Sequence, residues 1–200
     1  MAKRRASVAR ETKETKVSVA IDLDGRGDAK IATGIGMLDH LLSQIAKHGL
    51  MDLTVQAKGD LSTDEHHTVE DVGLAIGRAL DEALGTRDGL VRMADASVPL
   101  DEALATVALD LSGRGYAVVE VAWTGERIGE LPSDLVSHLV WSLASEGKFT
   151  VNARVHSGVN DHHKAETLFK ALGRALGAAT RLEPRRSGRS PSTKGKLKAN

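Results

Sequence analysis

The sequence predicts an α+β protein in which two copies of a β-β-α-β-α unit pack together as a sandwich. First, residues 19–27 (Val-Ala-Ile-Asp-Leu-Asp-Gly-Arg-Gly) match residues 107–115 (Val-Ala-Leu-Asp-Leu-Ser-Gly-Arg-Gly). Second, Gly-Arg-Ala-Leu occurs at both 77–80 and 173–176. Third, two single residues between these stretches recur at one shared offset, His40 as His138 and Gly49 as Gly147. Three matches in the same order indicate an internal duplication.

Each unit has strand and helix patterns in the same order. Alternating apolar residues predict strands, and apolar residues at helical spacing predict helices. The first unit is expected to contain strands at 17–23, 29–33 and 50–57 and helices at 36–49 and 68–84. The second is expected to contain strands at 105–111, 116–122 and 149–155 and helices at 131–146 and 161–180. Each unit should form a small sheet covered on one face by two helices.

Three segments follow from this pattern: a first repeat at 1–90, a second repeat at 91–182 and a basic arm at 183–200. Ser62, Thr63 and Asp64 precede the helix at 68–84 and are residue types that cap helix N-termini.

The composition excludes several kinds of chemistry. The chain has no Cys, so disulfides, thiolate zinc sites, iron–sulfur clusters and Cys nucleophiles are ruled out. Lys and Arg together number 27 and so do Asp and Glu, so the whole chain has no field that attracts nucleic acid or membrane. No apolar run reaches membrane-spanning length, and no apolar region follows the basic start. We therefore expect a cytoplasmic protein.

A His-His-x-x-Glu motif occurs twice, at 66–70 and at 162–166. Adjacent helical residues point about 100° apart, so the two His of one motif cannot easily bind one ion, whereas Glu can pair with either. Two metal ions are therefore the simplest interpretation. With the equivalent residues His40 and His138, the candidate ligands are His40, His66, His67, Glu70, His138, His162, His163 and Glu166.

Eight ligands divide into four per ion, which leaves open positions for substrate on an octahedral metal. Imidazole with carboxylate suits Mn, Fe, Ni, Co or Zn, and six-fold coordination favours Mn or Fe. A single His pair is more often a solvated helix end than a ligand. Two copies, each with an equivalent His in the preceding helix, favour metal binding.

Several motifs together resemble the imidazoleglycerol-phosphate dehydratase family of histidine biosynthesis. They are Gly-Ile-Gly-Met-Leu-Asp-His at 34–40, Asp-Glu-His-His-Thr-Val-Glu-Asp at 64–71, Asn-Asp-His-His at 160–163 and Ser-Thr-Lys-Gly at 192–195. The resemblance runs nearly end to end. It implies a fold like domain 2 of ribosomal protein S5, a 24-subunit shell and two Mn²⁺ ions per active site at subunit interfaces. It also implies the same eight metal ligands.

The family converts D-erythro-imidazole glycerol phosphate to imidazole acetol phosphate by loss of water. The C–H beside the imidazole is weakly acidic, so its removal needs an electron sink. A metal on each ring nitrogen would favour the imidazolate, which can expel hydroxide through a diazafulvene-like intermediate. Glu14, in the family's Glu-Thr-x-Glu-Thr segment, is the expected acid/base and substrate contact.

Further substrate contacts are expected from the resemblance and from spacing. Gln44 and His48 lie one and two turns beyond His40 and should face the substrate. The positions expected to bind phosphate are Arg92, Arg114, Lys170, Ser192, Thr193 and Lys194. We expect the basic arm to fold over the phosphate rather than to bind nucleic acid, because no aromatic residue interleaves its charges.

The chain departs from the family pattern at a few positions. Val159 stands where the family usually has Lys or Arg, Gly115 replaces a common Pro, and Trp141 replaces Arg. These changes bear on phosphate affinity and leave the eight candidate ligands in place.

Two other functions use the same ligand set: a dinuclear metallohydrolase, and a metal-binding or storage protein. The hydrolase would need a bridging carboxylate. Asp39 and Asp161 are adjacent to candidate ligands but are expected rather to support those ligands. A storage protein would not need the phosphate-binding positions.

Overall fold

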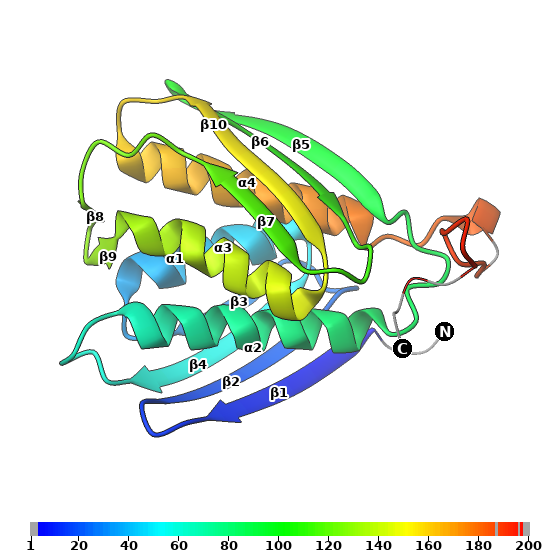
Figure 1. The fold of residues 1–200 in the computed structure, drawn as a ribbon, viewed down its shortest axis with the longest axis horizontal. Helices are drawn as coiled ribbons and strands as arrows, with labels where there is room; N and C mark the ends of the chain where they lie inside the picture. The colour runs from blue at the N-terminus through cyan, green and yellow to red at the C-terminus, as the bar shows by residue number, and fades with distance from the viewer. Residues whose placement is uncertain (1–3, 187, 196, 198–200) are drawn as a thin grey trace.

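Two four-stranded sheets enclose four helices in the computed structural model, which describes residues 4–186, 188–195 and 197 (Figure 1). The first sheet has the order β1 (Arg5–Glu11), β2 (Thr15–Asp22), β4 (Asp52–Gly59) and β3 (Ala29–Ala32). The second has the order β5 (Met93–Leu100), β6 (Ala103–Asp110), β10 (Thr150–Ser157) and β7 (Tyr116–Glu120). The helices are α1 (Gly36–Gly49), α2 (His66–Leu84), α3 (Ser133–Gly147) and α4 (Asp161–Ala179).

The duplicated α+β fold is confirmed, and each repeat also has an N-terminal edge strand. Only Val8 is buried in β1, and β5 alternates between exposed and half-buried residues, so neither strand has a strong apolar pattern. The turn at 24–27 does not join paired strands, because β4 lies between β2 and β3. β4 is antiparallel to β2 and parallel to β3. A parallel pair needs a crossover connection, and α1 provides it.

Short elements complete the second repeat. β8 (Arg127–Ile128) and β9 (Leu131–Pro132) form a two-stranded sheet just before α3. The expected helix at 131–146 therefore starts two residues later, after Pro132. A single turn of 3-10 helix, η1 (Pro184–Arg186), opens the basic arm.

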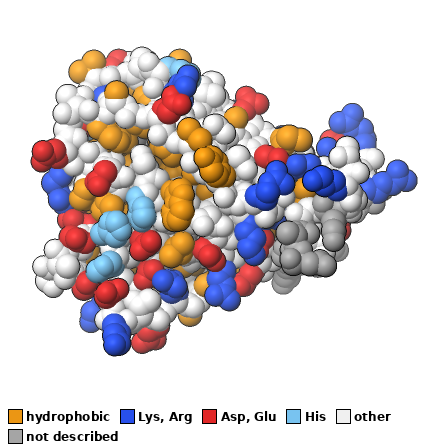
Figure 2. All heavy atoms as spheres, in the orientation of Figure 1, with side chains coloured by type: hydrophobic (Ala, Val, Ile, Leu, Met, Phe, Trp, Pro, Cys, Tyr) orange, Lys and Arg blue, Asp and Glu red, His pale blue; other side chains and the backbone are white. Residues whose placement is uncertain are grey.

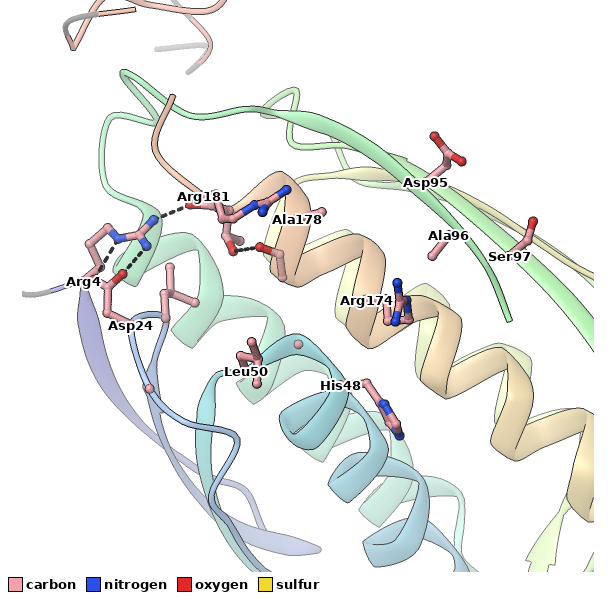
Figure 3. A pocket seen from close by; sticks show the side chains of 15 residues that line it. Arg4, Asp24, His48, Leu50, Asp95, Ala96, Ser97, Arg174, Ala178 and Arg181 are labelled. Carbon is pink, nitrogen blue, oxygen red and sulfur yellow. Dashed lines mark hydrogen bonds and ion pairs between the residues drawn. The ribbon is translucent and has the colours of Figure 1, made fainter. Parts of the chain in front are cut away.

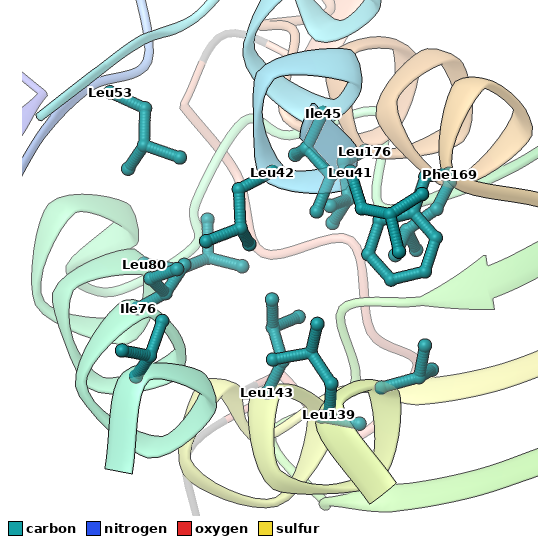
Figure 4. Packing of buried hydrophobic residues seen from close by; sticks show 14 of the residues in the cluster. Leu41, Leu42, Ile45, Leu53, Ile76, Leu80, Leu139, Leu143, Phe169 and Leu176 are labelled. Carbon is teal, nitrogen blue, oxygen red and sulfur yellow. The ribbon is translucent and has the colours of Figure 1, made fainter. Parts of the chain in front are cut away.

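The helices pack in pairs that combine the two repeats, α1 with α4 and α2 with α3. Glycines allow close backbone approach at both contacts. A Cβ added at Gly173 would lie 2.9 Å from the carbonyl oxygen of Ile45, and one at Gly77 would lie 2.5 Å from that of Leu143. The apolar faces meet in one aliphatic core (Figure 4), to which α1 contributes Leu41, Leu42 and Ile45 and α4 contributes Phe169 and Leu176.

Both pairs are parallel, as successive contacts show. Gly173 lies against Ile45 and Gly177 against Gly49 one turn later, and the glycines of α2 meet α3 in the same ascending order. All four helices therefore begin at one end of the molecule, and the basic arm leaves from the opposite end (Figure 1). The helix starts that carry the His motifs are thereby brought together.

Candidate metal centre

One group of candidate ligands forms where α1 and α4 begin. The first cluster is defined as His40, His162 and Glu166. Nε2 of His40 lies 3.0 Å from Oε2 of Glu166, and Nε2 of His162 lies 3.1 Å from the same oxygen. The i,i+4 spacing of His162 and Glu166 places both on one face of α4, and the parallel packing of α1 places His40 beside them.

An equivalent group forms where α2 and α3 begin. The second cluster is defined as His66, Glu70 and His138. The rings of His66 and His138 have centroids 4.7 Å apart, and Nε2 of His138 lies 3.7 Å from Oε1 of Glu70. In each cluster the three ligand atoms lie within 4.8 Å of one another. Nε2 of His138 is buried and has no hydrogen-bond partner among the described residues, which is costly for a polar atom.

The carboxylate of Glu166 is held in its ionised form. Burial opposes ionisation, but hydrogen bonds from Lys170 and His40 outweigh it and lower the pKa of Glu166 to about 2. Nζ of Lys170 lies 2.7 Å from Oε1 of Glu166, so one carboxylate oxygen is engaged by a cation while the other meets the two imidazoles. The first cluster therefore carries a fixed negative charge.

The second His of each motif points away from its own cluster. The rings of His66 and His67 are nearly perpendicular, at 85°, and those of His162 and His163 are at 86°. Their Nδ1 atoms meet carboxylates instead. Nδ1 of His67 lies 3.1 Å from Oδ2 of Asp60, and Nδ1 of His163 lies 2.8 Å from Oε2 of Glu102. A carboxylate on Nδ1 fixes the ring and leaves Nε2 as the ligand atom, as in many metal-bound histidines.

The sequence did not identify Asp60 and Glu102. A signal for Glu102 was present, because it occupies the position of Glu14 when residues 107–115 are aligned with 19–27. Glu102 also accepts hydrogen bonds from the N–H groups of Asn160 and Val159. The bond from Asn160 has the largest effect, and together with those from His163 and Val159 it lowers the pKa of Glu102 to about 2. Hydrogen bonds from His67 and His163 to Asp60 and Glu102 raise the pKa of both histidines.

Asp39 and Asp161 do not contact the candidate ligands as expected. Asp39 accepts hydrogen bonds from the N–H and hydroxyl of Thr33. Asp161 accepts from the N–H groups of Thr124 and Gly125 and pairs with Lys164. Both carboxylates fix loops beside the helix starts.

Glu14 lies in the exposed turn between β1 and β2. Its charge contributes to the raised pKa of His67, so it lies near that histidine. Its backbone N–H donates to the hydroxyl of Thr12, and none of the described residues has a side-chain hydrogen bond or ion pair with its carboxylate. Glu14 and Glu102 thus occupy equivalent turns, one with a free carboxylate and the other with a bound one.

The expected substrate contacts separate into two groups. Gln44, His48 and Lys170 lie along α1 and α4 beyond the first cluster. Arg92 lies at the other end of α4, where its N–H bonds the carbonyl of Ala179. The side chain of Arg92 holds Asp110 and the carbonyl of Pro191, and so fixes the basic arm there.

The other expected phosphate contacts lie at the same end as Arg92; they are Arg114, Ser192, Thr193 and Lys194. Within the arm, the hydroxyl of Ser192 accepts a hydrogen bond from the N–H of Lys194. Figure 2 shows the separation on one face of the molecule: histidines gather with acidic side chains at one end, and Lys and Arg gather at the other. A single chain therefore does not bring the candidate metal ligands and the arm together.

Trp141, one of the departures from the family pattern, lies against the second cluster. Its ring stacks on His138 with centroids 6.1 Å apart and planes at 15°. The indole is 49% exposed and lines a groove of about 400 Å³ together with His66 and His138. The indole thus forms one wall of this groove beside the second cluster.

The fold and these clusters define a duplicated α+β protein with two equivalent His–carboxylate sites. Residues 33–176 match the model of a family described as imidazoleglycerol-phosphate dehydratase. The chain is 57% identical over 197 residues to the imidazoleglycerol-phosphate dehydratase of Dehalococcoides mccartyi, covering 98% of this chain and 99% of the relative. It is 53% identical over 194 residues to that of Methanothermobacter thermautotrophicus, covering 97% and 98%.

Solved structures agree. The crystal structure of the enzyme from Staphylococcus aureus matches with a TM-score of 0.81 at 31% identity, covering 90% of this chain and 99% of that one. The one from Pyrococcus furiosus matches with a TM-score of 0.79 at 36% identity, covering 95% and 100%. The chain belongs to the imidazoleglycerol-phosphate dehydratase family, a family of dehydratases in histidine biosynthesis.

Within the described residues, the helices are too short or too polar to cross a membrane.

Proposed function

We propose that the chain removes water from D-erythro-imidazole glycerol phosphate to give imidazole acetol phosphate, using two Mn²⁺ ions per active site. The observation that carries this proposal is the pair of equivalent His–carboxylate clusters at one end of the molecule. An imidazole ring has two nitrogens on opposite sides, and two ions can bind one each. The two nitrogens of the substrate's ring thus correspond to the two equivalent clusters.

The residues fit a divalent transition metal. Each cluster offers two imidazoles and one carboxylate within a small volume, and the buried Nε2 of His138 lacks any other partner in the described structure. His67 and His163 are partly exposed, and among the described residues no partner engages their Nε2 atoms, so each could act as the fourth ligand of an ion. When bound, the metals would make the substrate imidazole a better electron sink and hold a substrate hydroxyl.

We propose that His67 and His163 serve clusters of neighbouring subunits, so that each active site lies at a subunit interface. The arm supports this. Arg92 lies beside Ala179, at the end of α4. Ala179 is thirteen residues beyond Glu166, a distance of roughly 20 Å along the helix at 1.5 Å per residue. A substrate with a three-carbon chain cannot span that distance. The phosphate contacts of Arg92, Arg114, Ser192, Thr193 and Lys194 would then come from another copy within a homo-oligomer, which we propose has 24 subunits.

The chain's own residues divide the remaining work. Glu14 is the proposed acid/base, because its carboxylate is exposed and near His67, whereas the equivalent Glu102 is occupied by His163. The carboxylate of Glu14 would take the proton from the carbon that becomes the ketone and give it to the carbon beside the ring, from which the hydroxide has left. That hydroxide leaves as water with the proton of the remaining hydroxyl. Gln44 and His48 would orient the glycerol chain along α1, and Lys170 of α4 would contribute to phosphate binding.

The test is turnover by metal-free protein to which Mn²⁺ is added back. We expect imidazole glycerol phosphate to yield an enolisable ketone that absorbs in strong alkali, only with the metal present. His66→Ala should abolish this activity, whereas His156→Ala, a histidine outside both clusters, should not. Release of inorganic phosphate without ketone would instead indicate a metallohydrolase and overturn the proposal.

A further inference from the structure

The turn that carries Glu14 is joined to α2 through a buried carboxylate. Residues 12–14 connect β1 to β2 at the end of the molecule where the four helices begin (Figure 1). Asp71 follows the candidate ligand Glu70 on α2 and is only 5% exposed. Adjacent helical residues point about 100° apart, so Glu70 faces the second cluster while Asp71 faces β1 and β2.

Both oxygens of the Asp71 carboxylate are occupied. Nε of Arg10, in β1, lies 2.6 Å from Oδ1. The hydroxyl of Thr15, at the start of β2, donates to Oδ2. Thr15 is buried as well, so the loss of its hydroxyl would leave a buried acceptor with one donor fewer, which is costly. Asp71 therefore ties both strands of the hairpin to α2.

Hydrogen bonds continue from Asp71 into the turn in one direction. A hydroxyl has one proton to donate, and Thr15 donates its proton to Asp71. Oγ1 of Thr12 lies 3.2 Å from Oγ1 of Thr15 and must therefore be the donor of that pair. Its lone pairs then accept from the N–H groups of Glu14 and Thr15, at 3.2 and 3.0 Å. The chain of bonds thus ends on the backbone of Glu14.

The second repeat shows that this network is not needed to form the turn. The aligned repeats differ at all four of its side chains: Arg10 corresponds to Val98, Thr12 to Leu100, Thr15 to Ala103 and Asp71 to Thr167. The hydroxyl of Thr167 is buried and has no hydrogen-bond partner among the described residues. Yet β5 pairs with β6 just as β1 pairs with β2, in antiparallel register. The network is therefore a feature of the first repeat alone.

The two turns hold their glutamates in different ways. Glu102 is held by its carboxylate, which accepts hydrogen bonds from His163 and from two backbone N–H groups. Glu14 is held through its backbone, and no side chain that the structure describes bonds to its carboxylate. An acid/base needs a carboxylate that is free to react but fixed in place. Bonds to the backbone of the turn meet both needs.

We propose that Asp71 is a positioning residue, which acts through Thr15 and Thr12 to fix Glu14 relative to α2. The inference rests on the proposed role of Glu14 as the acid/base. The same helix carries His67, and Glu14 lies near that histidine. One rigid element thus sets the places of a candidate metal ligand and of the acid/base. Since a displacement of about 1 Å can lower a rate roughly a hundredfold, this anchor bears directly on turnover.

Steady-state kinetics of Thr15 variants with saturating Mn²⁺ tests the assignment, because Thr15 links Asp71 to the turn. Thr15→Val keeps the shape of the side chain but loses the hydroxyl, and it should lower kcat roughly ten- to a hundredfold. The Michaelis constant and the Mn²⁺ affinity should stay within about twofold, since neither depends on where Glu14 lies. Thr15→Ser keeps the hydroxyl and should retain most of kcat.

Two further variants control for the fold. Thr12→Val breaks the same chain of bonds in the exposed turn, away from the core, and should also lower kcat. Thr167→Val, at the position equivalent to Asp71, removes a hydroxyl without a described partner and should change none of these quantities. Equal losses of kcat in Thr15→Val and Thr15→Ser would overturn the proposal. So would an unchanged kcat with a higher Michaelis constant or weaker Mn²⁺ binding, because the network would then serve the substrate or the metal.

Hydrogen exchange of the metal-free full chain tests the anchor without turnover. Thr15→Val should speed exchange at the N–H of Glu14 about fivefold, the effect of one weakened hydrogen bond, and should leave residues 100–103 of the equivalent turn unchanged. Unchanged exchange at Glu14 would overturn the anchor. Faster exchange in this variant, together with no turnover by the unaltered chain, would instead contradict the dehydratase proposal.

Discussion

Arg87 fills the C-terminal end of the α2/α3 pair, whereas the C-terminal end of the α1/α4 pair opens into a cavity of about 660 Å³ lined by His48, Arg174 and Arg181 (Figure 3). The side chain of Arg87 is fully buried and contacts Asp81 at 2.7 Å and the carbonyls of Gly147 and Lys148 at 2.8 Å each. Lys148 adds a second cation on Asp81. In the other pair the position of Asp81 is occupied by Gly177 and that of Arg87 by Glu183.

The N-terminal ends of the two helix pairs carry the same candidate ligands. Both begin with two histidines and a glutamate, and both have an outer histidine held by a carboxylate. Duplication thus preserved the candidate ligands at one end and let the other end diverge, once into a buried ion network and once into a cavity. The clusters and the C-terminal ends can be perturbed separately.

The largest expected effect is on turnover when either cluster loses its carboxylate. Glu70→Gln and Glu166→Gln should each lower kcat/KM by roughly a thousandfold or more, since a catalytic metal contributes several kcal/mol. Steady-state kinetics with saturating Mn²⁺ measures this, and Glu82→Gln, on the exposed side of α2, is the control. A large loss in only one of the two variants would mean that the clusters are not equivalent.

Arg87→Ala should lower the free energy of unfolding by about 3–5 kcal/mol, because it leaves Asp81 buried with less compensation. Arg174→Ala, at the open end of the other pair, should change stability little. Urea denaturation of the metal-free protein gives both values. Similar urea midpoints for the two variants would show that Arg87 and Arg174 contribute equally to the free energy of unfolding, which would contradict this difference between the two ends.

Removal of the carboxylates behind the outer histidines should weaken metal binding. Asp60→Asn and Glu102→Gln should each reduce Mn²⁺ affinity by about 10–100-fold, the usual effect of losing a group that orients a ligand histidine. Titration of metal-free protein with Mn²⁺ measures the change. Unaltered affinity in both variants would exclude His67 and His163 from the ligand set.

Truncation after Glu183 should raise the Michaelis constant about tenfold or more, because charge-assisted contacts to the substrate phosphate are lost, while metal binding stays intact. The comparison variant is Arg92→Lys, which keeps the charge but loses the two-oxygen contact with Asp110 that fixes the arm. Kinetics identical to those of the full chain would remove the arm from the active site.

The smallest effect concerns pH. The pKa of Glu166 is lowered to about 2 from an ordinary 4.5, so the ionised form stabilises the folded metal-free protein above pH 4.5. That contribution is lost as the pH falls from about 4.5 toward 2. Thermal unfolding over this range should be less steep in pH for Glu166→Gln than for the unaltered chain. Identical slopes would mean that Lys170 and His40 do not stabilise the carboxylate.

Much of the fold could be predicted, because the duplication repeats both the motifs and the order of elements. The edge strands β1 and β5 could not, since Arg5–Glu11 buries only one side chain and Met93–Leu100 is half-exposed along its length. Likewise, the turn at 24–27 gave no sign that β4 would insert between β2 and β3. Strand order depends on tertiary pairing rather than on local pattern.

The grouping of the candidate ligands was predictable only in part. Helical spacing indicated that the two His of a motif would separate, and they do. Which His joins which cluster depends on the pairing of α1 with α4 and of α2 with α3, and that pairing is set by glycine contacts between helices far apart in the sequence. The partners Asp60 and Glu102 lie in turns that come near the outer histidines only in the folded chain.

Metal content per chain tests the central claim most directly. Elemental analysis of the assembled protein after Mn²⁺ loading and removal of free metal should give two ions per chain. Glu70→Gln and Glu166→Gln should each lower that number toward one, because each removes a ligand from one cluster only. A single ion per chain in the unaltered protein, or an unchanged count in both variants, would contradict the account of two equivalent metal sites.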